Sequence, residues 1–191
     1  MRLPKITSRM MLAIFLLCAI WLALVAISPF LVPAHTLRDL SGSVSVRDNA
    51  DQFRNLDALP KTIYSIGDVE CHQIASRSLF VNGNEMPFCA RDFGLFIGLA
   101  AGFGLMTFYR YKVNPILALV GLVPMGIDGG LQLITSYESN NPLRLATGTI
   151  AGLAFALLLS LYVFLLVEDW RDPRARRSGS DGDGAPKDRV P

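Results

Sequence analysis

The sequence predicts an all-α membrane protein, a four-span transmembrane helical bundle with one extracytoplasmic loop region. Hydrophobic residues make up 51% of the 191-residue chain, and the mean hydropathy is +0.38. Charged residues make up only 18%, below the roughly 25% of typical soluble domains. They are also nearly absent from four apolar segments, as expected for helices that cross a bilayer.

The first predicted span is 10–32, after a short basic N-terminus, 1–9, that we expect in the cytoplasm. About 23 residues without charge are enough to cross about 30 Å of hydrocarbon as a helix. A secretory signal peptide is the alternative, because Val32-Pro33-Ala34 resembles a cleavage site. The long apolar core favours an uncleaved helix.

The remaining boundaries follow from changes in polarity along the chain. A polar region with turn residues at Pro60, Gly67 and Asn82-Gly83-Asn84 is the predicted extracytoplasmic loop region, and helical periodicity predicts short helices within it. The predicted segments are 33–92 for this region, 93–109 for the second span, 115–135 for the third, 136–146 for an outer loop, 147–167 for the fourth span and 168–191 for a disordered cytoplasmic tail.

Small residues recur at every fourth position in the second and fourth spans. Gly94, Gly98 and Gly102 form one such stripe, and the stretch from Gly148 to Ser160 forms the other. Stripes of this kind allow two membrane helices to approach closely. We therefore expect the second and fourth spans to pack together.

Basic residues predict the orientation. They precede the first span, join the second and third at Arg110 and Lys112, and follow the fourth. The positive-inside rule therefore predicts a multi-pass protein of the cell membrane with both termini in the cytoplasm. The outer boundary would then hold most of the unusual polar residues.

Composition and motifs exclude several classes of function. The net charge of +2 and the lack of a basic patch interleaved with aromatics argue against a nucleic-acid partner. The chain has no P-loop, Rossmann, HExxH or GxSxG pattern.

Two cysteines define the first part of a candidate site. Cys71, His72, Cys89 and Asp92 carry ligand atoms suited to zinc or another divalent metal ion. In an oxidising exterior, Cys71 and Cys89 could instead form a disulfide worth about 3 kcal/mol. From the residues alone we favour the disulfide, and Cys18 lies inside the first span.

A carboxylate inside the third span defines the second part. Asp128 costs about 2.5–3.5 kcal/mol to insert, so it requires a partner or a wet cavity. It either pairs structurally with Arg91 or Arg144, or acts as a ligand or base. We predict catalytic roles for Asp128, His72 and Gln132, and ligand-binding roles for Arg91, Arg144, Asn141, Gln73 and Arg77.

The polar residues together resemble a known family. Cys71-His72-Gln73, Pro87-Phe88-Cys89-Ala90-Arg91, Ile127-Asp128-Gly129 and Ser139 to Arg144 resemble the predicted prokaryotic membrane proteins of domain of unknown function 2085. The resemblance covers roughly residues 65–155. It implies that the candidate residues form one common polar constellation. The family typically has a further cysteine where this chain has Asp92, so a carboxylate replaces a thiolate.

We therefore expect a binding or catalytic site at the outer membrane face that acts on a lipid-like or small anionic ligand. The alternatives are a small oligomeric transporter or accessory subunit, and a structural protein with a Cys71–Cys89 disulfide. The expected partners are the lipid bilayer and a small-molecule or lipid ligand. A homo-oligomer stays open, and the sequence leaves enzymatic activity undecided.

Overall fold

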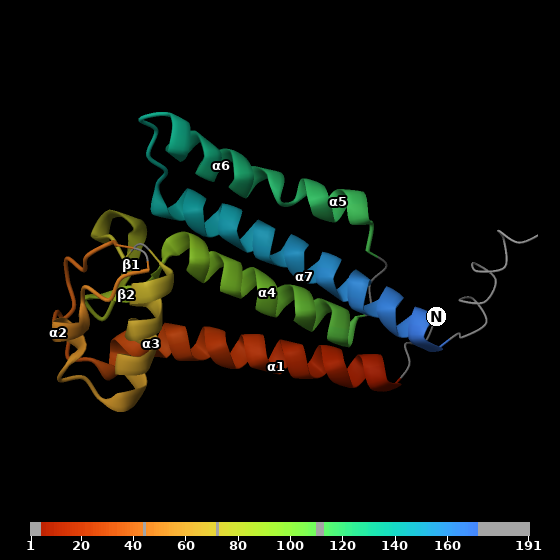
Figure 1. Cartoon of the computed structure of the whole chain (residues 1–191), viewed down its shortest axis with the longest axis horizontal. Helices are drawn as coiled ribbons and strands as arrows, with labels where there is room; N and C mark the ends of the chain where they lie inside the picture. Colours follow the sequence, from red (N-terminus) through yellow and green to blue (C-terminus); the bar gives the residue numbers. More distant parts are fainter. Residues whose placement is uncertain (1–4, 44, 72, 110–112, 172–191) are drawn as a thin grey trace, which may run out of the picture.

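The computed structural model describes residues 5–43, 45–71, 73–109 and 113–171. A bundle of long helices carries a small module at one end (Figure 1). The elements are α1 (Lys5–Ile27), η1 (Ser28–Leu31), α2 (Ala50–Phe53), α3 (Ala58–Glu70), η2 (Ala75–Arg77), β1 (Ser78–Val81), β2 (Asn84–Cys89), α4 (Ala90–Phe108), α5 (Pro115–Val120), α6 (Val123–Ile134) and α7 (Asn141–Arg171).

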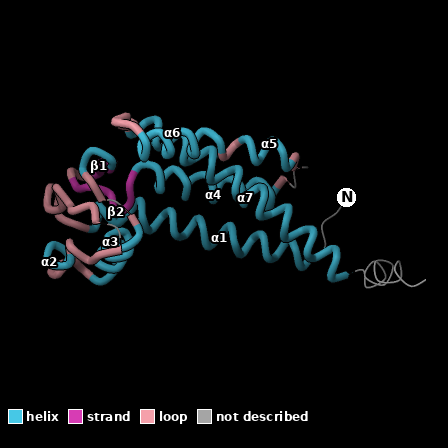
Figure 2. The backbone as a smooth tube through the Cα atoms, turned by 45° about the horizontal axis from the view of Figure 1, so that its top comes forward, coloured by secondary structure: helices cyan, strands magenta, loops and turns pink. Residues whose placement is uncertain are grey.

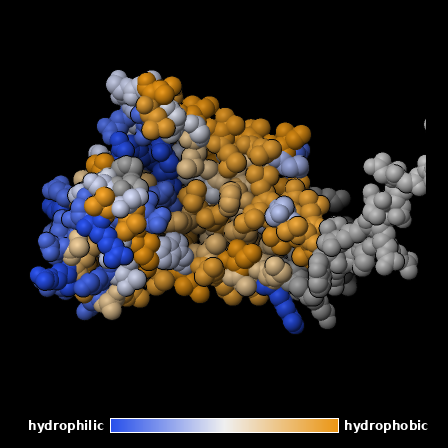
Figure 3. All heavy atoms as spheres, in the orientation of Figure 1, coloured by the Kyte–Doolittle hydropathy of each residue, from blue (hydrophilic) through white to orange (hydrophobic). Residues whose placement is uncertain are grey.

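Within the described residues, four helical segments are long and apolar enough to cross a membrane. They are Arg9–Leu31, Ala90–Phe108, Pro115–Ile134 and Asn141–Val167. The predicted all-α, four-span fold is therefore confirmed. Hydrophobic residues cover the bundle, and hydrophilic residues gather at the end that carries the module (Figure 3).

Helices α4 and α7 form the centre of the bundle, in contact along their small-residue faces. A Cβ atom added at Gly98 would lie 2.2 Å from the carbonyl oxygen of Thr149, and one at Gly152 would lie 2.2 Å from that of Leu95. Both distances are far below van der Waals contact, so the two backbones touch where side chains are absent. The predicted pairing of the second and fourth spans is confirmed.

Helix α1 packs on the other side of α4. Its Phe15 ring lies against Gly104, and its Trp21 ring meets Phe88 and Phe96 edge to face, with ring centroids 5.8 and 6.0 Å away. Met11 and Val25 of α1 are fully buried. The first span is thus packed into the bundle.

The third span is broken into α5 and α6, which run along α7 (Figure 1). The break falls just before Pro124, which lies in the first turn of α6. In a first turn the backbone N–H that proline lacks would have no acceptor within the helix, so proline is tolerated there. Apolar side chains on this pair point outward, and Leu133 is 88% exposed. Such a face suits contact with lipid.

Two helices begin earlier than the sequence predicts. Helix α7 begins at Asn141 because the Oδ1 atom of Asn140 accepts a hydrogen bond from the backbone N–H of Leu143, at 2.9 Å, and caps it. Arg144, expected in an outer loop, therefore lies in the first turns of α7. Likewise α4 begins at Ala90, which places Asp92 in its first turn.

The module between α1 and α4 contains α2, α3 and a two-stranded antiparallel hairpin. The expected turn at Asn82-Gly83 is present, with positive φ at both residues. The strands β1 and β2 on either side of it were not predicted. The Tyr64 hydroxyl donates to the carbonyl of Glu85 at 2.6 Å, which fastens β2 to α3.

The hairpin and the α6–α7 connection lie at the same end of the bundle (Figure 2). Helix α1 begins at the opposite end, where α4 also ends and α5 begins (Figure 1). The basic residues Arg110 and Lys112, and residues 172–191 of the predicted tail 168–191, lie outside the described residues. The first residues of that tail, 168–171, continue helix α7, so the fourth helix extends beyond its predicted end at residue 167.

Two glycine-to-alanine substitutions test the contact between α4 and α7. Gly152→Ala should destabilise the protein by about 1–3 kcal/mol, because the new methyl group collides with the α4 backbone. Gly130→Ala on α6 should be neutral or stabilising by up to about 1 kcal/mol, because no described residue outside the helix's own turn comes within 4 Å of the added Cβ atom and alanine favours helix. Thermal unfolding in detergent micelles measures both. Equal effects would contradict the packing.

Burial also predicts a pH dependence of stability in the module. Desolvation raises the pKa of the buried Glu85, and likewise that of Asp68. A carboxyl whose pKa is higher in the folded state binds more protons when folded, so stability is greatest below its unfolded pKa, about 4.3 for Glu, and falls as pH rises through the folded value.

Unfolding temperatures should therefore fall between about pH 4.5 and pH 7. Glu85→Gln should reduce this decrease of the unfolding temperature with pH. Asp51→Asn on the surface of α2 should leave the decrease unchanged, because Glu85 is then intact. A slope that Glu85→Gln leaves unchanged would refute this origin.

Candidate functional site

A polar cavity of about 200 Å³ lies where the module meets the ends of α4, α6 and α7. The residues that line it are Glu70, Cys71, Arg77, Cys89, Arg91, Asp92, Gln132 and Arg144. They come from α3 and the residue after it, η2, β2, α4, α6 and α7. Elements far apart in the sequence thus meet at one site.

Two sulfur atoms and a carboxylate meet on one wall of this cavity. Ligand atoms of Cys71, Cys89 and Asp92 all lie within 4.8 Å of one another. The Cys89 thiol donates to Oδ2 of Asp92 at 3.3 Å, and the Cys89 backbone N–H donates to the Cys71 sulfur at 3.2 Å. Both cysteines are free. The three side chains together present a ligand set suited to one divalent ion.

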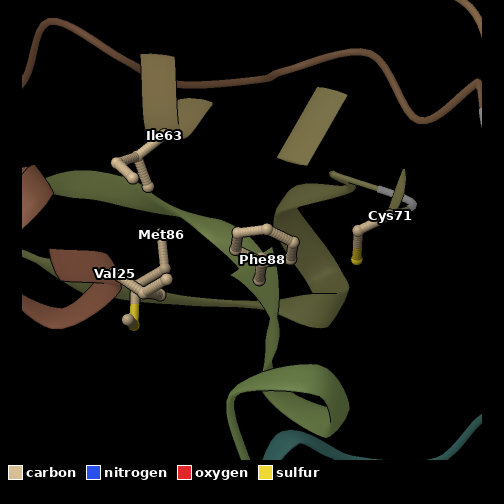
Figure 4. Close-up of a cluster of buried hydrophobic side chains, with 5 residues drawn as sticks. All are labelled: Val25, Ile63, Cys71, Met86 and Phe88. Carbon is tan, nitrogen blue, oxygen red and sulfur yellow. The ribbon is translucent and has the colours of Figure 1, made fainter. Parts of the chain in front are cut away.

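Local structure explains the position of each sulfur atom. Cys71 follows the last turn of α3 in extended conformation, and Cys89 ends β2 immediately before α4. Phe88 lies between Cys71 on one side and Met86 with Val25 on the other (Figure 4). This apolar packing holds the end of β2 against the end of α3.

The thiols lie in an environment that favours protonation of Cys71. Hydrogen bonding to Cys89, together with burial, raises the pKa of the Cys71 thiol. Without a cation beside it, the buried sulfur therefore keeps its proton at neutral pH.

Arg91 and Asp128 form the main ion pair of the site. Nη2 of Arg91 donates to Oδ2 of Asp128, and the side chain of Asp128 is only 5% exposed. The Tyr137 hydroxyl donates to the other oxygen at 3.4 Å. Asp128 thus connects α6 to α4, in agreement with the structural interpretation of this membrane carboxylate. Gln132, one turn further along α6, reaches the cavity itself.

Arg144 and Arg77 share a weaker carboxylate partner. Oε1 of Glu138 lies 3.6 Å from Nε of Arg77 and 3.8 Å from Nη2 of Arg144. Arg144 is fully buried, whereas Glu138 is largely exposed. These separations exceed normal hydrogen-bond lengths.

The predicted ligand-binding residues Gln73 and Asn141 do not line the cavity. Gln73 is buried in the module, where its Nε2 donates to the carbonyl of Pro87 at 2.7 Å. The Nδ2 atom of Asn141 donates to the carbonyl of Ser78 at 3.0 Å and so joins α7 to β1. His72, predicted as a metal ligand and catalytic residue, lies outside the described residues.

Sequence reasoning did not assign a role to Glu138 or Glu70. Glu138 was noticeable only as part of a loop rich in polar residues, and its partners come from η2 and α7. Glu70 directly precedes Cys71 and lies exposed at the cavity. Neither contact follows from spacing along the chain.

A larger hollow of about 450 Å³ lies on the module between Arg47 and α3. Its lining residues include Lys61, Ser65 and Glu70, but no cluster of metal-ligating groups. It contains none of the residues that the sequence singles out, whereas several of them line the cavity at the bundle end.

Comparison with known proteins agrees with the family resemblance seen in the sequence. The family of predicted membrane proteins named DUF2085 matches residues 71–158. An uncharacterized protein of Methanothermobacter thermautotrophicus is 33% identical over 100 residues, which cover 51% of this chain and 90% of the relative. The chain belongs to the DUF2085 family.

An uncharacterized protein of Methanocaldococcus jannaschii is 39% identical over 95 residues, which cover 47% of this chain and 61% of that relative. No solved structure matches the chain. The DUF2085 segment includes every residue that lines the cavity except Glu70, which directly precedes it. The family segment and the polar site therefore coincide.

A double-mutant cycle tests the Arg91–Asp128 pair. Asp128→Asn should destabilise the protein by about 3 kcal/mol, because a largely buried guanidinium loses its counter-charge. Adding Arg91→Met to Asp128→Asn should recover part of this loss, because no buried charge is then left unpaired. Chemical or thermal unfolding in detergent measures the cycle. Strictly additive effects would show that the two groups do not interact.

Proposed function

We propose that this protein holds a divalent metal ion at the outer membrane boundary and binds an anionic, lipid-like or small ligand beside it. The observation that supports this most directly is the convergence of Cys71, Cys89 and Asp92 on one wall of a cavity whose other walls carry arginines. A membrane protein with such a site is equipped to bind an anion next to a cation.

The chemistry of the ligands favours zinc. Two thiolates and a carboxylate are common zinc ligands, and three protein ligands with an open fourth position are typical of catalytic zinc sites. The fourth position would face the cavity, where water or an oxygen of the ligand could bind. His72, next to Cys71, is a further candidate ligand from the sequence alone; as a fourth protein ligand it would close this position and make the centre structural.

The same residues also bear on the alternative of a disulfide. The Cys71 and Cys89 sulfurs are close, which a disulfide requires as well. A disulfide, however, gives no role to Asp92, whose carboxylate accepts a hydrogen bond from Cys89. The approach of Asp92 favours the metal ion.

Asp128 is better suited to positioning than to direct chemistry. Its carboxylate already binds Arg91 and Tyr137. We propose that it holds Arg91 toward the cavity, where Arg91 and Arg144 attract negative charge. Gln132 would add an uncharged donor from α6.

The proposed location depends on the orientation of the chain. The residues that line the cavity come from the module and from the ends of α4, α6 and α7 near it, and these elements lie at the end of the bundle opposite the start of α1 (Figure 1). The basic residues Arg2, Lys5 and Arg9 lie before or near the start of α1 in the sequence. The positive-inside rule therefore supports a location of the site at the extracytoplasmic face. It would then be accessible from the outer leaflet and from the aqueous exterior.

Metal analysis of purified protein tests the proposed centre. The wild type should carry about one zinc-like ion per chain. The Cys71→Ser, Cys89→Ser double variant should lose it, and Asp92→Asn should bind it more weakly. Cys18→Ser is the matched control and should retain the ion, because Cys18 lies within α1 away from this cluster.

Thiol labelling distinguishes the alternatives in the same samples. If the ion is present, labelling of Cys71 and Cys89 should increase after treatment with a chelator alone. Labelling that requires a reductant, together with negligible metal in the wild type, would replace the metal centre with a disulfide.

A further inference from the structure

Arg144 is the most unusual side chain of the cavity. It is 1% exposed, and neither Nη1 nor Nη2 has a hydrogen-bond partner among the described residues. Its only ion-pair contact in the described chain is Glu138 at 3.8 Å, beyond hydrogen-bond length. A buried guanidinium without hydrogen bonds is costly unless a ligand supplies acceptors.

Other unsatisfied donors surround the same cavity. Nε of Arg77, Nε of Arg91 and Nε2 of Gln132 are buried and lack acceptors within the part of the chain that the structure describes. With the two terminal nitrogens of Arg144, the cavity walls offer donor atoms from four side chains. A ligand that carries several acceptor oxygens would therefore match these unpaired donors.

The charges around the cavity also leave a deficit of negative charge near Arg144. Asp128 is paired with Arg91, and Asp92 lies with the two sulfurs. Glu70 is exposed. Arg77 and Arg144 consequently share one carboxylate among the described residues, that of the largely exposed Glu138.

We propose that this cavity binds a phosphoryl dianion, and that Glu138 is a built-in competitor which the dianion displaces. The proposal rests on the proposed function and names its ligand class. A phosphate monoester has about two negative charges and three terminal acceptor oxygens, which match two guanidiniums and several free donors. A carboxylate has one charge and two oxygens, which Glu138 already supplies.

The same phosphoryl chemistry could belong to a lipid headgroup or to a free phosphate. The cavity lies where the module meets the ends of the bundle helices, and Figure 3 shows that hydrophobic residues give way to hydrophilic ones at this end of the molecule. This position suits a phosphorylated lipid, although soluble phosphate carries the same recognised group. The two sources require separate measurements.

Binding should be measured on protein in zwitterionic detergent, once metal-stripped by chelator and once zinc-loaded. The probes are inorganic phosphate and dihexanoyl phosphatidic acid, with dihexanoyl phosphatidylcholine as the control lipid. Phosphatidic acid should bind to the metal-stripped protein, because the arginine side chains are sufficient to bind its phosphoryl group. Tighter binding of phosphatidic acid than of phosphate assigns a lipid headgroup, and equal binding assigns the phosphoryl group alone.

Substitutions at Glu138, whose side chain is 61% exposed, and at Arg77, whose side chain is 35% exposed, separate the test from folding, because neither side chain belongs to the buried core. Glu138→Gln should tighten phosphate binding by about threefold, because a competing exposed carboxylate is removed. Arg77→Gln should weaken it by at least about tenfold, because a charged donor is lost. Arg144→Lys should also weaken binding, since lysine keeps the charge but loses the planar pair of donors.

The proposal is overturned if neither phosphate nor phosphatidic acid binds, or if Glu138→Gln and Arg77→Gln both leave the affinity unchanged. The comparison of stripped and loaded protein separates this failure from that of the metal centre. A protein that binds zinc but no phosphoryl group keeps the metal centre and refutes this inference. A protein that binds the phosphoryl probes but takes up no zinc keeps this inference and refutes only the metal centre.

Discussion

The close contact between α4 and α7 is the constraint on which the rest of the structure depends. A Cβ atom at Gly148 would lie 2.1 Å from the carbonyl oxygen of Arg91, so these helices touch at the level of the cavity. Arg144 is one turn before Gly148, and Asp92 follows Arg91. The small-residue interface between α4 and α7 thus brings the Arg144 guanidinium of α7 beside Arg91 and Asp92 at the start of α4.

This placement has an energetic cost that the protein tolerates. Ionised side chains near hydrocarbon are expensive, and such residues generally face partners or polar cavities. Here Asp128 neutralises Arg91, whereas Arg144 is buried with only a distant carboxylate. Well-packed apolar residues would be at least as stable at these positions. An incompletely paired cluster of this kind is better explained by a ligand than by stability.

The small module contributes several of the residues that line the candidate site. Its hairpin and α3 place Cys89 and Cys71 at neighbouring ends, and the aromatic contacts of Phe88 with Trp21 and Phe96 attach this arrangement to α1 and α4. A proposed metal ion and a proposed phosphoryl group would lie in one cavity, so each could polarise the other. The shared cavity connects the two proposals physically.

The sequence by itself determined the membrane fold, because uncharged stretches of sufficient length and stripes such as Gly94, Gly98 and Gly102 act locally or between two helices. It also identified most residues of the candidate site by their chemical type, since Asp128 and the two cysteines are conspicuous in an apolar chain. Only the tertiary structure decided that the Gln73 side chain is hydrogen-bonded inside the module and that Asp128 forms an ion pair with Arg91. It also decided that Glu138 contacts both Arg77 and Arg144. Those contacts join α4, α6, α7 and the module, and hydropathy and spacing carry no information about which side chains meet when separate elements pack.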